Sequence, residues 1–219
     1  MPGGTLGRQA SLRKAYNPEQ EHAMLQSLDR TPGAPSSAAV LWRRTDITGL
    51  EYFTLTGEPD APMLAGTVIA MPDESPLRVE YAIRCTGAWR TAQTMVEMLH
   101  GGVRRSLQLT STEALEWHRD GTHVAALDGC DDVDLSITPS TNTLPIRRLA
   151  LAIGESRAVT AAWIRFPSLE IAPLDQRYTR VGERRYRYES GGGAFVAELE
   201  VDDRGIVVDY PPAWTRVRR

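Results

Sequence analysis

Apolar and polar residues alternate with a period of two along most of the chain after residue 37. Within the segment 77–86, for example, Val79, Tyr81 and Ile83 are separated by charged or small residues. This period is typical of β-strands with one buried face, because successive side chains of a strand point to opposite sides. The pattern predicts strands at 38–44, 49–56, 64–70, 77–86, 90–100, 103–111, 113–119, 122–128, 157–166, 176–181, 184–189, 194–201 and 205–210.

No long stretch between these segments has apolar residues at helical spacing, which argues against a fold of alternating strands and helices. A sheet with more than about ten strands rarely stays open and flat. We therefore predict a mainly β fold, in which a single curved antiparallel sheet forms a barrel or half-barrel with one or two short helices. The segment 143–154 fits either a helix that begins near Pro145 and stops at Gly154, or one more strand.

Two hairpins are specified by their turn residues. Asp120-Gly121 is typical of a two-residue type I′ turn, which places His118 opposite His123. Gly101-Gly102 predicts a second turn, and counting along its strands places Arg105 on an apolar face. An unpaired charge on such a face is costly. We therefore expect Arg105 to contact a carboxylate or to face the mouth of a cavity.

The first 37 residues differ in composition from the rest, since they are rich in Gly, Pro, Ser and Gln. Only 18–30 carries a thin helical stripe. We predict a mobile tail with a short helix at 1–37 and one β domain at 38–219. Over all 219 residues, 25 Lys and Arg against 28 Asp and Glu give a net charge of −3. This balance creates no overall attraction to nucleic acid or anionic lipid, so no nucleic-acid partner is predicted.

The chain lacks two kinds of apolar stretch that would indicate a location in a membrane or outside the cytoplasm. No stretch approaches the roughly 18 consecutive apolar residues of a transmembrane helix. Residues 1–20 also lack the apolar stretch of about 7–15 residues that a secretory signal contains. We therefore expect a cytoplasmic protein, in which Cys85 and Cys130 stay reduced and serve as packing residues.

The chain lacks the usual signatures of enzymes, namely Gly-x-Ser-x-Gly, His-Glu-x-x-His, the phosphate loop and the dinucleotide-binding glycines. The opposed His118 and His123 could hold a surface zinc ion together with Glu116. This hairpin tip supplies no further groups that would support such a metal site, so we interpret it as a turn exposed to solvent. No enzyme, cofactor or metal is therefore predicted.

The densest polar stretch is 127–148, which contains four aspartates followed by hydroxyls, an amide and two arginines. Such a set could bind calcium, supply an acid/base pair at Asp131 or Asp132, or bond sugar hydroxyls. In a structural role, the aspartates would pair with Arg147 and Arg148, which would lower their pKa values, and we expect this pairing. The candidate polar ligand-binding residues are Arg105, Asp128, Asp131, Asp132, Asn142, Arg147 and Arg148.

Aromatic residues are the second group of candidates, because their rings can stack on sugars or cover acyl chains. Trp117 falls on the apolar face of its hairpin, and the apolar residues around Trp163 also favour a core position. The candidate wall residues of a binding groove are Tyr81, Trp89, Trp117 and Trp163.

Several motifs resemble the putative glycolipid-binding domain family of bacteria. They include Leu127-Asp128-Gly129-Cys130, Thr141-Asn142-Thr143-Leu144-Pro145-Ile146-Arg147-Arg148, Ala162-Trp163-Ile164-Arg165-Phe166-Pro167 and Leu174-Asp175-Gln176-Arg177-Tyr178. The similarity spans about 38–216. It implies a curved β-sheet shell related in shape to the periplasmic carriers of lipoproteins. The resemblance supplies no catalytic or binding residue.

We therefore predict a non-enzymatic protein that binds a lipid-like or glycolipid-like ligand in an apolar groove of its curved sheet. Burial of the ligand would supply affinity, and a few polar groups would orient its head. Such a groove requires a cavity of at least about 300 Å³. The alternatives are a small-molecule hydrolase or other enzyme that uses Asp131 or Asp132, and an interaction scaffold with a filled core and no ligand.

Overall fold

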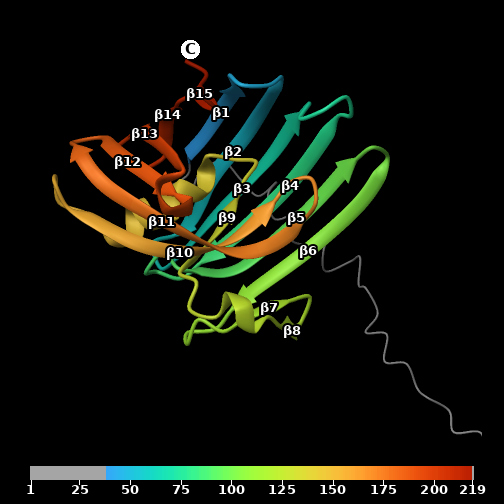
Figure 1. The fold of residues 1–219 in the computed structure, drawn as a ribbon, viewed down its shortest axis with the longest axis horizontal. Coiled ribbons are helices and arrows are strands. Elements are labelled where there is room, and N and C mark those ends of the chain that lie inside the picture. The colour runs from blue at the N-terminus through green and yellow to red at the C-terminus, as the bar shows by residue number, and fades with distance from the viewer. Residues whose placement is uncertain (1–37, 219) are drawn as a thin grey trace, which may run out of the picture. The chain divides into compact units, whose positions relative to one another are not determined.

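The computed structural model describes residues 38–218, which form one 15-stranded sheet with one α-helix and three 3₁₀ turns (Figure 1). The helix expected within 18–30 lies outside the described residues. The strands are β1 (Ala38–Arg44), β2 (Gly49–Glu58), β3 (Ala61–Ala70), β4 (Leu77–Cys85), β5 (Thr91–His100), β6 (Val103–Ser111), β7 (Trp117–Arg119), β8 (Thr122–His123), β9 (Asp132–Leu135), β10 (Ser156–Arg165), β11 (Glu170–Gly182), β12 (Arg185–Ser190), β13 (Phe195–Val201), β14 (Val207–Tyr210) and β15 (Trp214–Arg216).

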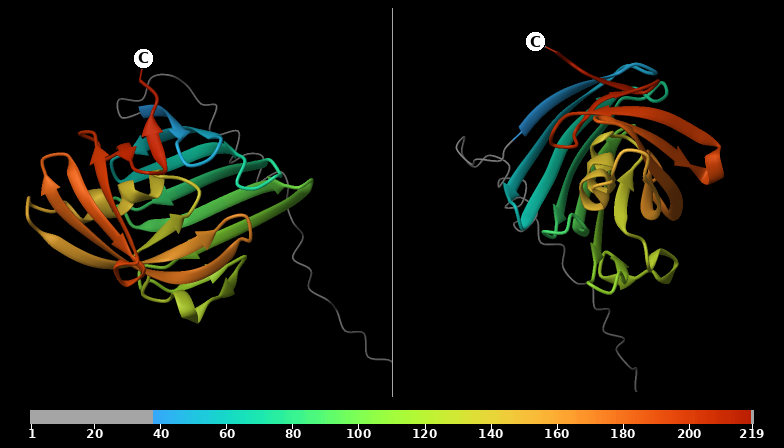
Figure 2. Two further views of the ribbon diagram at one scale, coloured as in Figure 1. Left: turned by 45° about the horizontal axis from the view of Figure 1, so that its top comes forward. Right: turned by 90° about the vertical axis from the view of Figure 1, so that its left-hand side faces the viewer.

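The sheet is open, with the strand order β8-β7-β6-β5-β4-β3-β2-β1-β15-β14-β13-β12-β11-β10-β9. Its end strands β8 and β9 do not pair with each other. The mainly β prediction of a single sheet is confirmed, but the predicted barrel or half-barrel is wrong. Figure 2 shows β2–β6 and β10–β13 on either side of residues 124–155, which we call the inner segment. This segment covers the apolar face, so the sheet does not need to close in order to bury it.

The sheet is also not purely antiparallel, because β9 pairs with β10 in parallel register. The chain passes between these two strands through the 3₁₀ turn η3 (Ser140–Asn142) and the helix α2 (Thr143–Leu149). A parallel pair needs such a crossover, since no tight turn can connect its strands. The helical alternative for 143–154 is thus confirmed as far as Leu149. None of the described helices is long and apolar enough to span a membrane.

Both predicted hairpin registers are confirmed. Asp120 and Gly121 have φ values of 50° and 82°, and His118 pairs with His123. Met98 pairs with Arg105 across the second hairpin, as counted from its turn. The predicted strand 122–128 is too long, because β8 ends at His123 and the 3₁₀ turn η2 (Ala125–Leu127) follows.

The main core lies on the inner face of the sheet, which we define as the face that carries Trp42, Phe53 and Tyr81. These three side chains are almost fully buried. The inner segment adds Leu127, Leu144 and further buried apolar residues to the same core. Packing of this kind fills space between the two halves of the sheet.

A cavity of about 510 Å³ lies on the opposite, outer face. It is lined by Arg43, Glu200, Val208, Asp209, Thr215, Arg216, Val217 and Arg218. Its charged walls differ from the apolar groove that the sequence predicts, and the groove itself stays a prediction.

Gly66 on β3 makes room for the buried Tyr81 of β4, with which it pairs. A Cβ atom at Gly66 would lie 2.6 Å from the Tyr81 hydroxyl oxygen and 2.7 Å from its ring. We expect Gly66→Ala to lower the free energy of unfolding by about 1–3 kcal/mol, because the ring must move within a packed core. Equilibrium unfolding in urea measures this change.

Gly182→Ala is the matched control for this substitution. Gly182 also belongs to a strand, but the nearest atoms to its added Cβ would be those of the Arg185 side chain, at an ordinary 3.5 Å or more. The control is expected to change stability by no more than about 0.5 kcal/mol. If both alanine substitutions lowered the free energy of unfolding equally, the packing of Tyr81 would not depend on the missing side chain at Gly66.

Candidate functional site

The polar stretch predicted at 127–148 lies largely in the interior and connects the two halves of the sheet. Thr138 donates a hydrogen bond to Glu51 of β2 at 2.7 Å, and Tyr178 of β11 donates one to Asn142 at 2.8 Å. The inner segment is therefore held from both sides. Three groups of polar residues can be distinguished along it.

The first group is the ion pair between Asp132 of β9 and Arg148 of α2. The Arg148 Nη2 atom lies 2.6 Å from Asp132 Oδ2, and Nε lies 3.2 Å from the same oxygen. The Asp132 side chain is 4% exposed, and its Oδ1 atom is buried with no hydrogen-bond partner among the described residues. This burial leaves a substrate no access to Asp132, which argues against its use as a catalytic acid or base.

Pairing of the aspartates is confirmed for Asp132, but the expected lowering of its pKa is wrong. Burial raises the pKa of Asp132 to about 6, against the opposing effect of Arg148. Loss of hydration of the buried carboxylate outweighs the neighbouring positive charge. The pKa of exposed Asp128 is lowered as expected, but through the backbone amide of Trp117 and then His123 and not through an arginine.

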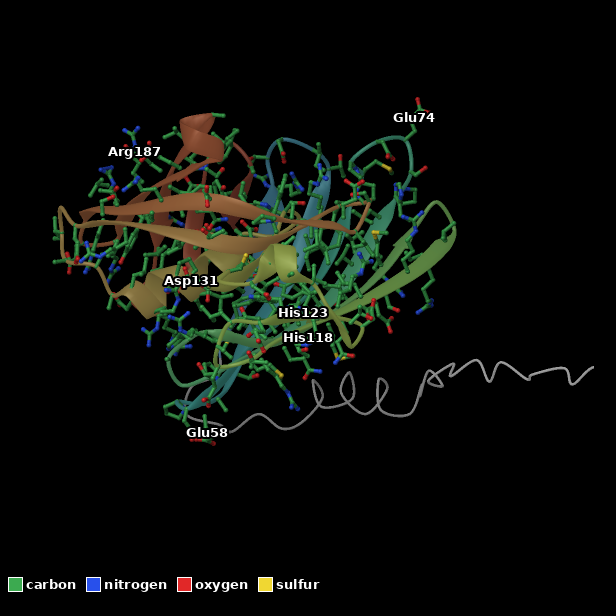
Figure 3. The ribbon with its side chains drawn as sticks, turned by 60° about the horizontal axis from the view of Figure 1, so that its bottom comes forward. Glu58, Glu74, His118, His123, Asp131 and Arg187 are labelled. Atoms are coloured by element: carbon green, nitrogen blue, oxygen red, sulfur yellow. The ribbon has the colours of Figure 1, made fainter. Side chains whose placement is uncertain are left out.

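Asp131 lies next to this group (Figure 3), and Arg147 precedes Arg148 on α2. Asp131 pairs with Arg90 at 3.1 Å and with Arg148 at 3.5 Å. The Arg147 guanidinium stacks on Trp89, 4.8 Å from the ring centroid. These contacts join α2 to the loop between β4 and β5, so they have a clear structural role.

The second group surrounds Glu51, which is fully buried on β2. Its Oε1 atom accepts hydrogen bonds from Tyr81 at 2.5 Å and from Thr138 at 2.7 Å, and Tyr81 also contacts Ser140 at 2.7 Å. Burial raises the pKa of Glu51 to about 8. Glu51 is therefore largely protonated at neutral pH, and this group connects β2 and β4 to η3.

The third group centres on Asp134, a half-buried residue of β9. Gln176 of β11 donates a hydrogen bond from Nε2 to Asp134 Oδ2 at 2.5 Å, and the Thr141 hydroxyl lies 3.5 Å from Oδ1. Burial raises the pKa of Asp134 to about 6. Its carboxyl group thus changes charge near neutral pH.

Aromatic side chains adjoin this carboxyl group. Tyr178, Tyr188 and Tyr210 all have raised pKa values, mainly through burial and partly through the negative charge of Asp134. The Tyr188 ring lies 6.0 Å from the Phe195 ring and 6.2 Å from the Tyr210 ring, between ring centroids. We call the set Asp134, Gln176, Tyr188, Phe195 and Tyr210 the Asp134 cluster.

The cluster is accessible at its edge. Phe195 is 40% exposed and Tyr210 is half-buried. The Tyr210 hydroxyl has no hydrogen-bond partner within residues 38–218. Trp163 lies beside Asp134 in the register of β9 and β10, so both side chains are on the same face. A carboxylate, an amide and exposed aromatic surface are therefore brought together at one place.

The predicted aromatic residues have different positions. Tyr81 and Trp117 are core residues, and the Trp117 indole donates to the carbonyl of Cys130 at 3.0 Å. Trp163 is only half-buried and has the Arg165 guanidinium 5.3 Å from its ring centroid, so its expected core position is wrong. β10 places Ala162 and Ile164 in the core instead.

Arg105 is exposed and has no carboxylate within ion-pair distance in the described part of the chain. Its register is right, since it pairs with buried Met98, but the β5–β6 hairpin extends beyond the inner segment that covers the apolar face. The expected carboxylate contact is therefore wrong. Water solvates the guanidinium at this uncovered position.

His118 and His123 lie side by side with ring centroids 5.3 Å apart (Figure 3). His123 bonds Asp128 at 2.8 Å. Within residues 38–218, no group of three or more His, Cys, Asp or Glu side chains is placed to hold a metal ion.

Glu51, Asp134 and Gln176 were not among the candidate residues predicted from the sequence, although the strand period contained a signal for Glu51 and Gln176. Glu51 alternates in phase with apolar Phe53, whereas Asp134 lies in β9, which was not predicted as a strand. Gln176 shares a face with Tyr178. A polar residue at an inward position of a strand was thus the available indicator.

Comparison with known proteins places this arrangement in a family. No curated protein matches the chain. The chain is similar to a DUF1089 family protein from Pseudomonas aeruginosa of known crystal structure, with 29% sequence identity, 98% of this chain and 100% of that chain covered, and a TM-score of 0.68. Residues 39–216 match the model of the family described as Putative glycolipid-binding, and the chain belongs to this family.

Proposed function

We propose that the protein binds a glycolipid-like ligand without chemical conversion, with the sugar of the ligand against the Asp134 cluster. The family description supports the class of ligand. The observation that carries the proposal is the half-buried residue Asp134 beside the accessible aromatic side chains Phe195 and Tyr210. A cytoplasmic location remains part of this proposal.

The chemistry of the cluster matches that of a sugar. A carboxylate accepts hydrogen bonds from sugar hydroxyls, and the amide of Gln176 both donates and accepts. The apolar face of a sugar ring packs against aromatic rings such as those of Tyr210 and Trp163. The hydrogen bonds would orient the head group, and the ring contact would exclude water from them.

The lipid part of the ligand would leave the cluster over Phe195. The middle of the inner face is occupied by apolar side chains of the inner segment, such as Leu144 and Ile146. An acyl chain is therefore expected along the margin of the inner face, where Phe195 is exposed. Burial of this chain would contribute about 25 cal/mol per Å².

Calorimetric titration of the full chain tests this proposal with two detergents as probes, each below its critical micelle concentration. Dodecyl maltoside carries a sugar head, and dodecyl dimethylamine oxide has the same alkyl chain without one. We expect only dodecyl maltoside to bind with a saturable heat. Asp134→Asn should weaken its binding about tenfold, since a hydrogen bond to a charged group contributes about 1.5–3 kcal/mol.

Asp209→Asn is the control for this substitution, because it removes a carboxylate from the outer face at a half-buried position. Its affinity for dodecyl maltoside should equal that of the unchanged protein. Equal binding of both detergents, or equal loss in the two variants, would contradict a sugar site at Asp134.

The affinity should also depend on pH. Because the pKa of Asp134 is about 6, the carboxylate that accepts the sugar hydroxyls forms as the pH rises through 6. Dodecyl maltoside should bind more tightly at pH 7.5 than at pH 5, and Asp134→Asn should show no such change. Titrations of both proteins across this range measure the effect. Tighter binding at pH 5 would assign the neutral acid as the binding form.

A further inference from the structure

The outer face of β1–β3 exposes apolar side chains that would be polar on an ordinary solvated face. Leu41, Leu50, Tyr52 and Ile69 are between 41% and 59% exposed. Leu41 pairs with Tyr52, and Leu50 pairs with Ile69, so the four side chains are neighbours on three adjacent strands. We call them the outer patch. Contiguous exposed apolar groups of this kind mark interaction surfaces.

Two arginines flank the row of the outer patch that carries Leu50 and Ile69, and Glu80 of β4 lies on the same face. In the cross-strand register, Arg43 of β1 precedes Leu50 and Ile69, and Arg78 of β4 follows them. Arg43 is exposed and has no carboxylate within ion-pair distance among residues 38–218, whereas Arg78 contacts Glu80 at 3.3 Å. Thus an arginine stands at each side of the patch.

The outer cavity of about 510 Å³ adjoins the patch at Arg43. Arg218 lines it as well, and Thr215, which pairs with Arg43, supplies a hydroxyl group. Two guanidinium groups and a hydroxyl are suitable partners for a phosphate. Glu200 and Asp209 continue the cross-strand row of Arg43 and Thr215 over β13 and β14, so a phosphate would lie at the side of the cavity that carries Arg43 and Arg218.

We propose that this outer face docks on an anionic phospholipid bilayer, with the outer patch against the lipids and a phosphate head group in the cavity at Arg43. Arginines near an anionic bilayer and apolar side chains at its interface both favour binding. The net charge of −3 gives no attraction of the whole molecule. The guanidinium of Arg43, which is exposed and unpaired within residues 38–218, supplies it locally.

A second copy of the chain is a less suitable occupant. A two-fold symmetric contact through the outer patch would bury Arg43 of each copy, unpaired in the described part of the chain, in an interface that excludes water, which is unfavourable. Glu80, the carboxylate beside the patch on the same face, already pairs with Arg78. The charges therefore favour an anionic surface.

Vesicle flotation of the full chain tests the proposal, with vesicles of phosphatidylcholine alone or mixed with phosphatidylglycerol. We expect binding to the mixed vesicles, and at least about tenfold weaker binding for the double variant Leu50→Glu, Ile69→Glu. Arg43→Gln should weaken binding about fivefold at low salt, which corresponds to about 1 kcal/mol for one arginine. Val196→Glu is the matched control, since Val196 is 46% exposed like Leu50 but lies on β13.

Several results would overturn the proposal. The first is equal binding to both vesicle types, and the second is a loss of vesicle binding with Val196→Glu as large as that with the double variant. The third is the absence of vesicle binding together with a dimer in analytical ultracentrifugation that the double variant Leu50→Glu, Ile69→Glu dissociates. If the double variant fails to fold in a thermal melt, Arg43→Gln alone decides between the outcomes. The affinity for dodecyl maltoside should stay unchanged in Arg43→Gln, so failure here is distinct from failure of the sugar site.

Discussion

Replacing Arg148 by methionine is expected to lower the free energy of unfolding by about 3–5 kcal/mol. Arg148 is the ion-pair partner of Asp132, whose side chain is 4% exposed. Methionine has a similar length but removes the charge, which leaves a buried carboxylate without its partner. Guanidinium chloride unfolding of both proteins at neutral pH measures the loss.

Two variants serve as controls for this result. Arg147→Met changes the neighbouring arginine, which stacks on Trp89 at the surface, and should cost only about 0.5–1 kcal/mol. Combining Asp132→Asn with Arg148→Met should recover part of the loss, because the uncompensated charge is then gone. Equal costs for the two arginines, or a double variant as unstable as the sum of its parts, would contradict a structural ion pair.

The second large effect is a loss of stability with rising pH. The pKa of Glu51 is about 8 in the folded protein against about 4.5 in the unfolded chain. The folded state therefore holds the proton that the unfolded state releases, and stability falls between pH 4.5 and pH 8. For Glu51 alone this loss is on the order of 4–5 kcal/mol. Asp132 and Asp134 add to it below about pH 6, since their pKa values are also raised.

Glu51→Gln is the informative variant, because glutamine keeps the shape and remains neutral at every pH. Its free energy of unfolding should change little between pH 6.5 and pH 8, whereas that of the unchanged protein should fall steeply. Unfolding curves in urea at a series of pH values provide both dependences. Parallel curves for the two proteins would show that Glu51 does not hold its proton in the fold.

Local patterns predicted the strands and hairpins well, because the period of two and the turn residues act within a few positions. Asp120-Gly121 and Gly101-Gly102 correctly specified the pairing of their strands. The parallel pair β9–β10 was not predictable in this way, since it depends on a crossover through the inner segment. The same segment explains the open sheet, because it covers the apolar face from within.

The candidate site was predicted only in part. The sequence identified the polar stretch and predicted that its aspartates pair with Arg147 and Arg148, which rests on residue type and proximity; the structure shows this pairing for Asp132 with Arg148. It could not indicate that burial would outweigh the arginine and raise the pKa of Asp132. Asp134 and Gln176 belong to strands β9 and β11, which are not neighbours in the sheet, so their contact required the fold.

Native mass spectrometry of the protein purified from its own cells can show whether a glycolipid is bound at Asp134. We expect a bound species whose fragmentation releases both a sugar unit and an acyl chain, and whose occupancy falls in Asp134→Asn but not in Asp209→Asn. A bound species without a sugar, or the same occupancy in both variants, would contradict a glycolipid-binding site at Asp134.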